Sequence, residues 1–139
     1  MLRLNRTTEY ALIALRYIQQ KKSDDFTSAR EIAVRFDLPF EILAKTLQKL
    51  KESGFIQASY GTKGGYVLKA NLSQTTLFEF LNLMEGCTNV VCCITSERSP
   101  KDCNYMSRCN IQPAMGRLND RFQAFLNQIT LEELLEDRK

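Results

Sequence analysis

The hydrophobic pattern of the first 70 residues predicts three amphipathic helices followed by a β-hairpin. The helices are expected over residues 7–20, 28–37 and 39–54, and the strands over residues 55–60 and 66–69. Ser28 with Glu31 predicts a capping box at the start of the second helix, and Pro39 suits the first turn of the third. The loop between the strands is rich in glycine, which is typical of a turn. This order of elements predicts a winged helix-turn-helix head.

The third predicted helix has one apolar face and one polar face. Its apolar stripe, expected to be buried, consists of Phe40, Leu43, Leu47 and Leu50. Outward glutamine and lysine side chains can donate to base edges and phosphates in a major groove, and the hairpin tip would reach the flanking minor groove. The candidate DNA-binding residues are Glu41, Ala44, Lys45, Gln48 and Lys49 on this helix, with Tyr60 and Lys63 on the hairpin. On this pattern alone, a packed domain with solvated lysines is an equal alternative.

The second half of the chain predicts two further helices and a short closing one. Thr76 and Glu79 form a second capping box, and the helix that they begin is expected to end at Gly86. A long helix follows an aperiodic stretch, and Thr130 precedes the closing helix. Apolar residues of the long helix are spaced alternately by four and three positions, which directs one continuous seam toward a partner helix. The seam, the expected dimer interface, consists of Ile111, Met115, Leu118, Phe122 and Phe125.

The predicted fold class is therefore mainly α with a small β wing. We divide the chain into a DNA-binding head over residues 1–70, a connecting helix over 71–86, a cysteine-rich loop over 87–110, and a dimerisation helix with a C-terminal helix over 111–139. The head has 12 Lys and Arg residues against 7 Asp and Glu residues, whereas the remainder has 7 against 9. The positive half is where a polyanion would bind.

Composition excludes several classes of function. A chain of 139 residues is too short for a large multi-domain enzyme, and it has no histidine, which excludes Ser-His-Asp catalysis and every zinc site that needs imidazole. No stretch approaches the roughly 18 consecutive apolar residues of a membrane span. The first residues lack the pattern of a signal peptide, so a cytoplasmic location is expected.

All five cysteines lie in the loop over residues 87–110, which we call the cysteine segment. Thiolates are soft ligands that suit iron-sulfur clusters and zinc, so the clustering indicates metal or redox chemistry. Three alternatives stay open: a structural zinc ion held by four of the cysteines, a thiol switch without a metal, and inert thiols. The absence of a Cys-x2-Cys pair disfavours zinc. Cys87 is expected to be a buried residue at the end of the fourth helix.

The chain resembles the Rrf2 family of bacterial winged-helix regulators. The resemblance covers nearly the whole chain, and its most specific pieces are the Gly64-Gly65-Tyr66 wing and the cysteine segment. The matching runs are residues 4–12, 50–56, 61–68, 84–86 and 129–131. The resemblance implies a homodimer with crossed long helices, two heads that read a palindromic DNA operator, and an iron-sulfur cluster near the interface.

The resemblance also implies a ligand set, with some departures from the family pattern. Cys93, Cys103 and Cys109 match the three cluster ligands, with Cys92 as the alternative to Cys93, although nine residues separate Cys93 from Cys103 where IscR- and NsrR-like members have about five. Gln112 stands where IscR-like members have a ligand histidine. NsrR-like members use an acidic residue near the start of the first helix, and Glu9 occupies that position.

One further departure lies in the wing, where Tyr60 replaces an arginine of many members, so minor-groove reading would fall to Lys63 or another residue.

The sequence therefore predicts a homodimeric DNA-binding transcription regulator, expected to be a repressor. Its cofactor is expected to be a 2Fe-2S or 4Fe-4S cluster that senses redox state, nitric oxide or iron-sulfur status. It is not expected to be an enzyme or to bind a membrane. The competing hypotheses are a thiol-switch or zinc-stabilised regulator of the same fold, and a cysteine-based redox enzyme or metal carrier.

Overall fold

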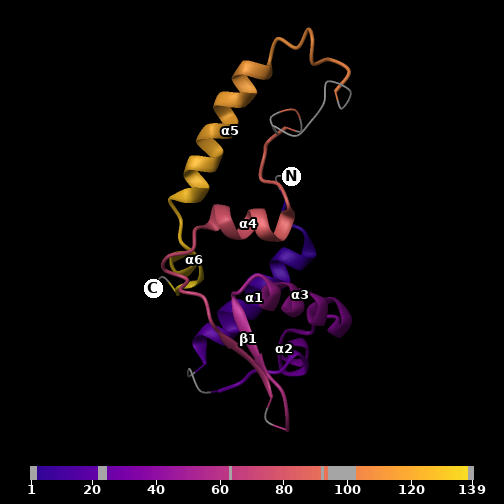
Figure 1. The fold of residues 1–139 in the computed structure, drawn as a ribbon, viewed down its shortest axis with the longest axis vertical. Coiled ribbons are helices and arrows are strands. Elements are labelled where there is room, and N and C mark those ends of the chain that lie inside the picture. Colours follow the sequence, from indigo (N-terminus) through magenta and orange to yellow (C-terminus); the bar gives the residue numbers. More distant parts are fainter. Residues whose placement is uncertain (1–2, 22–24, 63, 92, 94–102, 138–139) are drawn as a thin grey trace.

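The computed structural model describes residues 3–21, 25–62, 64–91, 93 and 103–137, and it confirms the predicted fold class (Figure 1). The helices are α1 (Arg6–Gln20), α2 (Ala29–Phe36), α3 (Phe40–Glu52), α4 (Leu77–Glu85), α5 (Gln112–Asn127) and α6 (Leu131–Leu135), and the strands are β1 (Ile56–Ser59) and β2 (Gly65–Leu68). None of the described helices is both long enough and apolar enough to cross a membrane.

The head consists of α1, α2 and α3 with the β1–β2 hairpin beside them. Its core is built from apolar side chains that have no exposed surface, including Leu15 of α1 and Leu43 and Leu47 of α3. Asp37 ends α2 in the left-handed conformation, which turns the chain toward α3. The predicted burial of Phe40 is wrong, because Pro39 caps α3 and leaves Phe40 as its first residue, with 49% of its surface exposed.

The wing is tied to the segment that precedes α2. Strands β1 and β2 pair antiparallel, and Thr27 exchanges two backbone hydrogen bonds with Tyr66, at 2.9 and 2.7 Å. A Cβ atom on Gly65 would lie 2.7 Å from the Thr27 backbone, a distance that real Cβ contacts do not show. Glycine at this position therefore permits the wing to approach α2.

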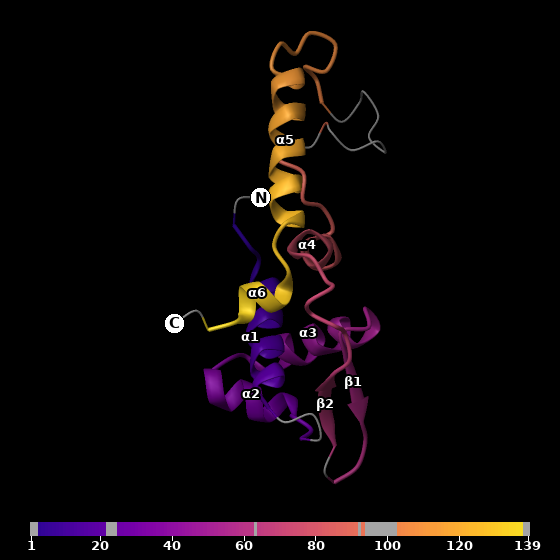
Figure 2. The same cartoon turned by 90° about the vertical axis from the view of Figure 1, so that its left-hand side faces the viewer.

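Helix α4 lies across the head, and α5 projects away from it (Figures 1 and 2). The predicted capping box of Thr76 and Glu79 is present, and Gly86 ends α4 in the left-handed conformation. Phe80 packs edge-on against Phe55, with ring centroids 5.7 Å apart. Apolar packing therefore attaches the middle of α4 to the short connection between α3 and β1.

Candidate nucleic-acid interface and cysteine segment

The outward face of α3 carries the polar residues that the sequence predicts for DNA contact. Glu41, Lys45 and Gln48 are exposed, and Ala44 is half-buried. The Gln48 side-chain amide donates to Glu52 Oε1 at 3.1 Å. Because α3 buries its opposite face in the head, this polar face is presented to a partner on a rigid support.

Two lysines of α3 are engaged within the protein. Lys49 Nζ donates to the carbonyl oxygen of Met84, near the C-terminus of α4, at 3.0 Å. Lys51 Nζ donates to the Tyr60 hydroxyl at 2.7 Å and lies 5.4 Å from the centre of that ring. The hydrogen bond to Tyr60 raises the pKa of Lys51 above its usual value. Tyr60 is 84% exposed, and Lys63 lies outside the described residues.

Two apolar side chains extend this surface in a way that the sequence pattern did not indicate. Phe40 is 49% exposed and Ile42 is 43% exposed, and both lie in the first turn of α3. The first turn of a recognition helix is the part that reaches base edges, where apolar groups contact thymine methyl groups. The periodicity assigned Phe40 to the core and gave Ile42 no role.

The cysteine segment is only partly described. Cys93, Cys103 and Cys109 are half-buried free thiols, and Cys92 lies outside the described residues. Cys87 is exposed, so the predicted burial of this thiol is wrong; Gly86 has already ended α4, and Cys87 follows it outside the helix. Within the described part of the chain, no three Cys, Asp or Glu side chains are grouped in a way that would hold a metal ion.

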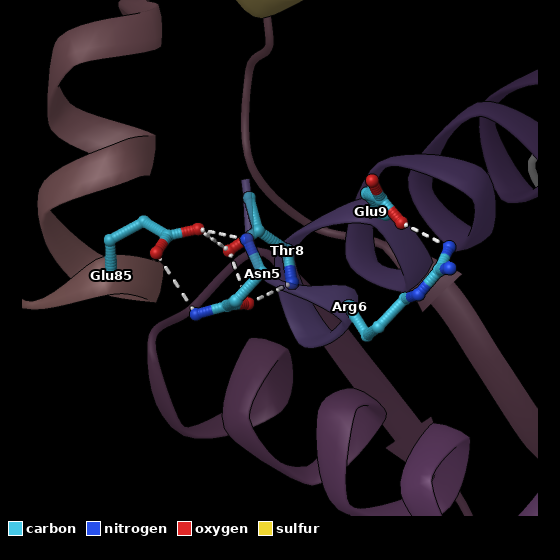
Figure 3. A network of polar contacts seen from close by, with 5 residues as sticks. All are labelled: Asn5, Arg6, Thr8, Glu9 and Glu85. Carbon is cyan, nitrogen blue, oxygen red and sulfur yellow. Dashed lines mark hydrogen bonds and ion pairs between the residues drawn. The ribbon is translucent and has the colours of Figure 1, made fainter. Parts of the chain in front are cut away.

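Glu9 lies in the first turn of α1 and forms an ion pair with Arg6 at 3.0 Å. Its side chain is 38% exposed. Figure 3 shows Glu9 and Arg6 turned away from Glu85 of α4, although both acidic residues lie around the start of α1. The structure therefore gives Glu9 a local partner on its own helix.

Glu85, the last residue of α4, joins that helix to the start of α1 (Figure 3). Glu85 Oε1 accepts from the backbone N–H of Asn5 at 3.0 Å and from the Thr8 hydroxyl at 2.5 Å, while Oε2 accepts from Asn5 Nδ2 at 3.0 Å. Thr8 is fully buried, and Asn5 caps α1. We call these three residues the Glu85 junction. Glu85 is 80 positions from Asn5 and 77 from Thr8 in the sequence, so the local sequence pattern does not predict this contact.

The first residues of the cysteine segment are bonded to α4 and α5. The Thr88 hydroxyl donates to Asn82 Oδ1 of α4 at 2.8 Å, and the Val90 N–H donates to Asn119 Oδ1 of α5 at 2.9 Å. Gln123 of α5 also donates to the Asn89 side chain, at 2.7 Å. Asn119 is 2% exposed. The sequence pattern gave Asn119 no role. Its burial and its bond to the Val90 N–H show that it holds the backbone of the cysteine segment against α5.

Helix α5 leaves a row of large apolar side chains exposed. Ile111, which precedes α5, is 56% exposed, Leu118 is 47% and Phe125 is 56% exposed, and each lies seven positions after the one before. Two other members of the predicted seam, Met115 and Phe122, are half-buried. Phe122 contacts the core of its own chain and lines an apolar cavity of about 370 Å³ at the foot of α5.

A comparison with known protein families identifies the family to which this chain belongs. Residues 4–137 match the Rrf2 family, which is described as an iron-dependent transcriptional regulator. The chain belongs to the Rrf2 family. It is therefore a DNA-binding transcriptional regulator and not an enzyme.

Known Rrf2-type proteins match this chain along almost its whole length. The HTH-type transcriptional regulator NsrR of Geobacillus kaustophilus is 26% identical over 137 residues, which cover 99% of this chain and 92% of that protein. The HTH-type transcriptional regulator IscR of Pectobacterium atrosepticum is 22% identical over 138 residues, which cover 99% of this chain and 82% of that protein.

Solved structures share the Rrf2 fold described above. CymR, the global cysteine regulator of B. subtilis, superposes with a TM-score of 0.72 at 23% identity, covering 97% of each chain. T. potens IscR superposes with a TM-score of 0.64 at 16% identity, covering 96% of this chain and 85% of the other. At these identities the likeness shows the fold alone.

Proposed function

We propose that this Rrf2 protein is a homodimeric repressor whose affinity for a palindromic operator is set by an iron-sulfur cluster in the cysteine segment. The observation that carries the proposal is the position of the segment. It begins at Cys87, two residues after Glu85, whose carboxylate is bonded to the start of α1 in the DNA-binding head. A chemical change that rearranges the segment can therefore be transmitted through Glu85 to the part that binds DNA.

The proposed DNA interface combines α3 with the wing. The residues are Glu41, Ala44, Lys45, Gln48 and Lys49 with Tyr60 and Lys63, to which the exposed Phe40 and Ile42 are added. Exposed amide and ammonium groups suit base edges and phosphates, and the apolar pair suits thymine methyl groups. Lys49 is placed at the edge of this interface because its ammonium contacts α4.

The proposed dimer interface is the exposed row on α5. Three large apolar side chains at a spacing of seven residues lie on one side of a helix, and burying such a row requires a second helix. A symmetric pair of heads matches a palindromic operator, because the two-fold axis of the dimer is repeated in the DNA.

The ligand types of the cysteine segment fit an iron-sulfur cluster. Cys93, or Cys92 in its place, with Cys103 and Cys109 would supply thiolates, and Glu9 would supply an oxygen ligand. Cys93, Cys103 and Cys109 are free and half-buried, so their sulfur atoms are available as ligands. They are not grouped as a preformed site, so assembly would have to draw them together. A cluster bound in this way would supply a redox-active and reactive centre.

The test is to purify the protein without oxygen, reconstitute it, and measure iron, sulfide and operator affinity. The operator is obtained by selection from random DNA. Coupling between two sites is typically worth about 1–3 kcal/mol, so loaded and stripped protein should differ roughly 5- to 150-fold in affinity. Cys103→Ala and Cys109→Ala should abolish visible absorbance, whereas Cys87→Ala should not. Equal affinity of the two forms would refute the proposal.

A thiol switch of the same fold is the second candidate. It is favoured by the free, half-buried state of Cys93, Cys103 and Cys109 and by the absence of a grouped metal site among the described residues. A CymR of Staphylococcus aureus, described as an oxidized form, has the same fold at a TM-score of 0.69 and 20% identity. Protein that stays free of iron and sulfide after reconstitution, yet changes operator affinity on oxidation, would identify this mechanism.

A further inference from the structure

The C-terminal end of α4 is attached to the DNA-binding head at two polar points. Glu85 accepts three hydrogen bonds from Asn5 and Thr8 at the start of α1, and Lys49 of α3 donates to the Met84 carbonyl. A carboxylate is favoured at the N-terminus of a helix and an ammonium at a C-terminus, because each complements the helix dipole. Both charges therefore favour the same placement of α4.

The other side of Glu85 leads directly into the cysteine segment. Gly86 ends α4, and Thr88, Asn89 and Val90 are then bonded to Asn82 of α4 and to Asn119 and Gln123 of α5. Only Gly86 separates Glu85 from the cysteine segment, and these bonds fix the first residues of the segment against α4 and α5. A displacement that starts at Val90 therefore has a short and well-bonded path to Glu85.

We propose that Glu85 is a positioning residue that couples the cysteine segment to α1 and, with Lys49, to α3. The coupling rests on the proposed function, in which the cysteine segment is the sensor. Apolar contacts such as Phe80 on Phe55 hold the middle of α4 on the head. The three directional hydrogen bonds of Glu85 fix the position of the C-terminal end of α4 relative to α1. Each bond is lost when its donor and acceptor separate by about 1 Å.

The experiment is a double-mutant cycle between the two ends of this path. Asn119→Ala removes the α5 acceptor of the Val90 N–H, and Glu85→Ala removes the α4 acceptor of the donors at the start of α1. Amide hydrogen exchange is followed over residues 5–9 and over α3, together with affinity for the selected operator. Asn119→Ala alone should speed exchange over residues 5–9 and change operator affinity by about fivefold or more. In the Glu85→Ala background, Asn119→Ala should change neither quantity further.

Two comparisons make the result decisive. Glu85→Gln keeps the side-chain volume and one acceptor, so it should retain the fold and show an intermediate effect. Glu79→Ala removes the carboxylate that caps the opposite end of α4. In the double variant, the fold-changes in operator affinity caused by Glu79→Ala and by Asn119→Ala should multiply, as expected for independent sites. The proposal is overturned if the Asn119 and Glu85 effects multiply, or if Asn119→Ala leaves exchange over residues 5–9 unchanged. Failure of the sensor proposal shows instead as equal operator affinity of loaded and stripped wild-type protein.

Discussion

At the scale of single residues, two lysines one turn apart on α3 have different surroundings. Lys45 is exposed, whereas the Lys49 ammonium is bonded to the Met84 carbonyl. Lys45→Gln is expected to lower the slope of log affinity against log salt by about 0.9, the value for one phosphate contact. Lys49→Gln is expected to lower the slope less, because the Lys49 ammonium at the edge of the interface is already bonded to Met84. Anisotropy titrations at several salt concentrations measure both slopes. An equal decrease for both would mean that Lys49 leaves α4 when DNA binds.

The exposed Ile42 leads to a second prediction at this scale. If its side chain contacts a thymine methyl group, replacing that thymine by uracil removes only the methyl. Burial of one such carbon is worth about 0.8 kcal/mol, so affinity should fall roughly fourfold. Ile42→Ala should bind the two operators equally. A fourfold loss that persists in Ile42→Ala would assign the contact to another residue, and Phe40→Ala would be the next variant.

At the scale of elements, Glu31 joins α2 to α1. Its carboxylate accepts from Lys21 Nζ at 2.8 and 3.0 Å and from the Tyr17 hydroxyl at 2.9 Å. The Glu31 N–H donates to the Ser28 hydroxyl as predicted, but the Glu31 carboxylate bonds to α1 and not to the Ser28 N–H, so only half of the predicted capping box forms. The Lys21 hydrogen bond lowers the pKa of Glu31, although partial burial opposes it.

The lowered pKa makes this contact dependent on pH. Its contribution is complete above the pKa of Glu31 in the unfolded chain and is lost as the pH falls through the lower pKa of the folded state. Because the pair is partly exposed, Glu31→Gln should cost about 0.5–1 kcal/mol at neutral pH and progressively less toward about pH 3. Thermal unfolding across this range measures the difference, with Glu41→Gln as the exposed control. A loss that is independent of pH would refute the ionic contribution.

At the scale of the whole molecule, the exposed row on α5 predicts the assembly state. Leu118→Glu would place a charge in the proposed interface, where it would have to be buried without a partner. It is expected to shift the protein from dimer to monomer at micromolar concentration in sedimentation experiments. Asp120→Lys is the control, because two residues along a helix place Asp120 on the opposite side. A wild-type protein that sediments as a monomer would contradict the interface.

The sequence by itself determined the elements whose stabilising partners are local. The Thr76–Glu79 capping box, the Gly86 helix end and the Gly64-Gly65 wing each depend on residues within a few positions, so periodicity and capping located them. The same reasoning predicted the face of α3 that holds Lys45 and Gln48.

Tertiary structure alone decided which residues meet across long separations. The bonds of Glu85 to Asn5 and Thr8, of Lys49 to Met84, and of Val90 to Asn119 join positions that are 29 to 80 residues apart. Hydrogen-bonding capacity is a property of each side chain, but its partner is set by how apolar packing brings the helices together. Tertiary structure likewise decided the exposure of Cys87 and Phe40, because the sequence locates the helix ends beside them but not whether another element covers these side chains.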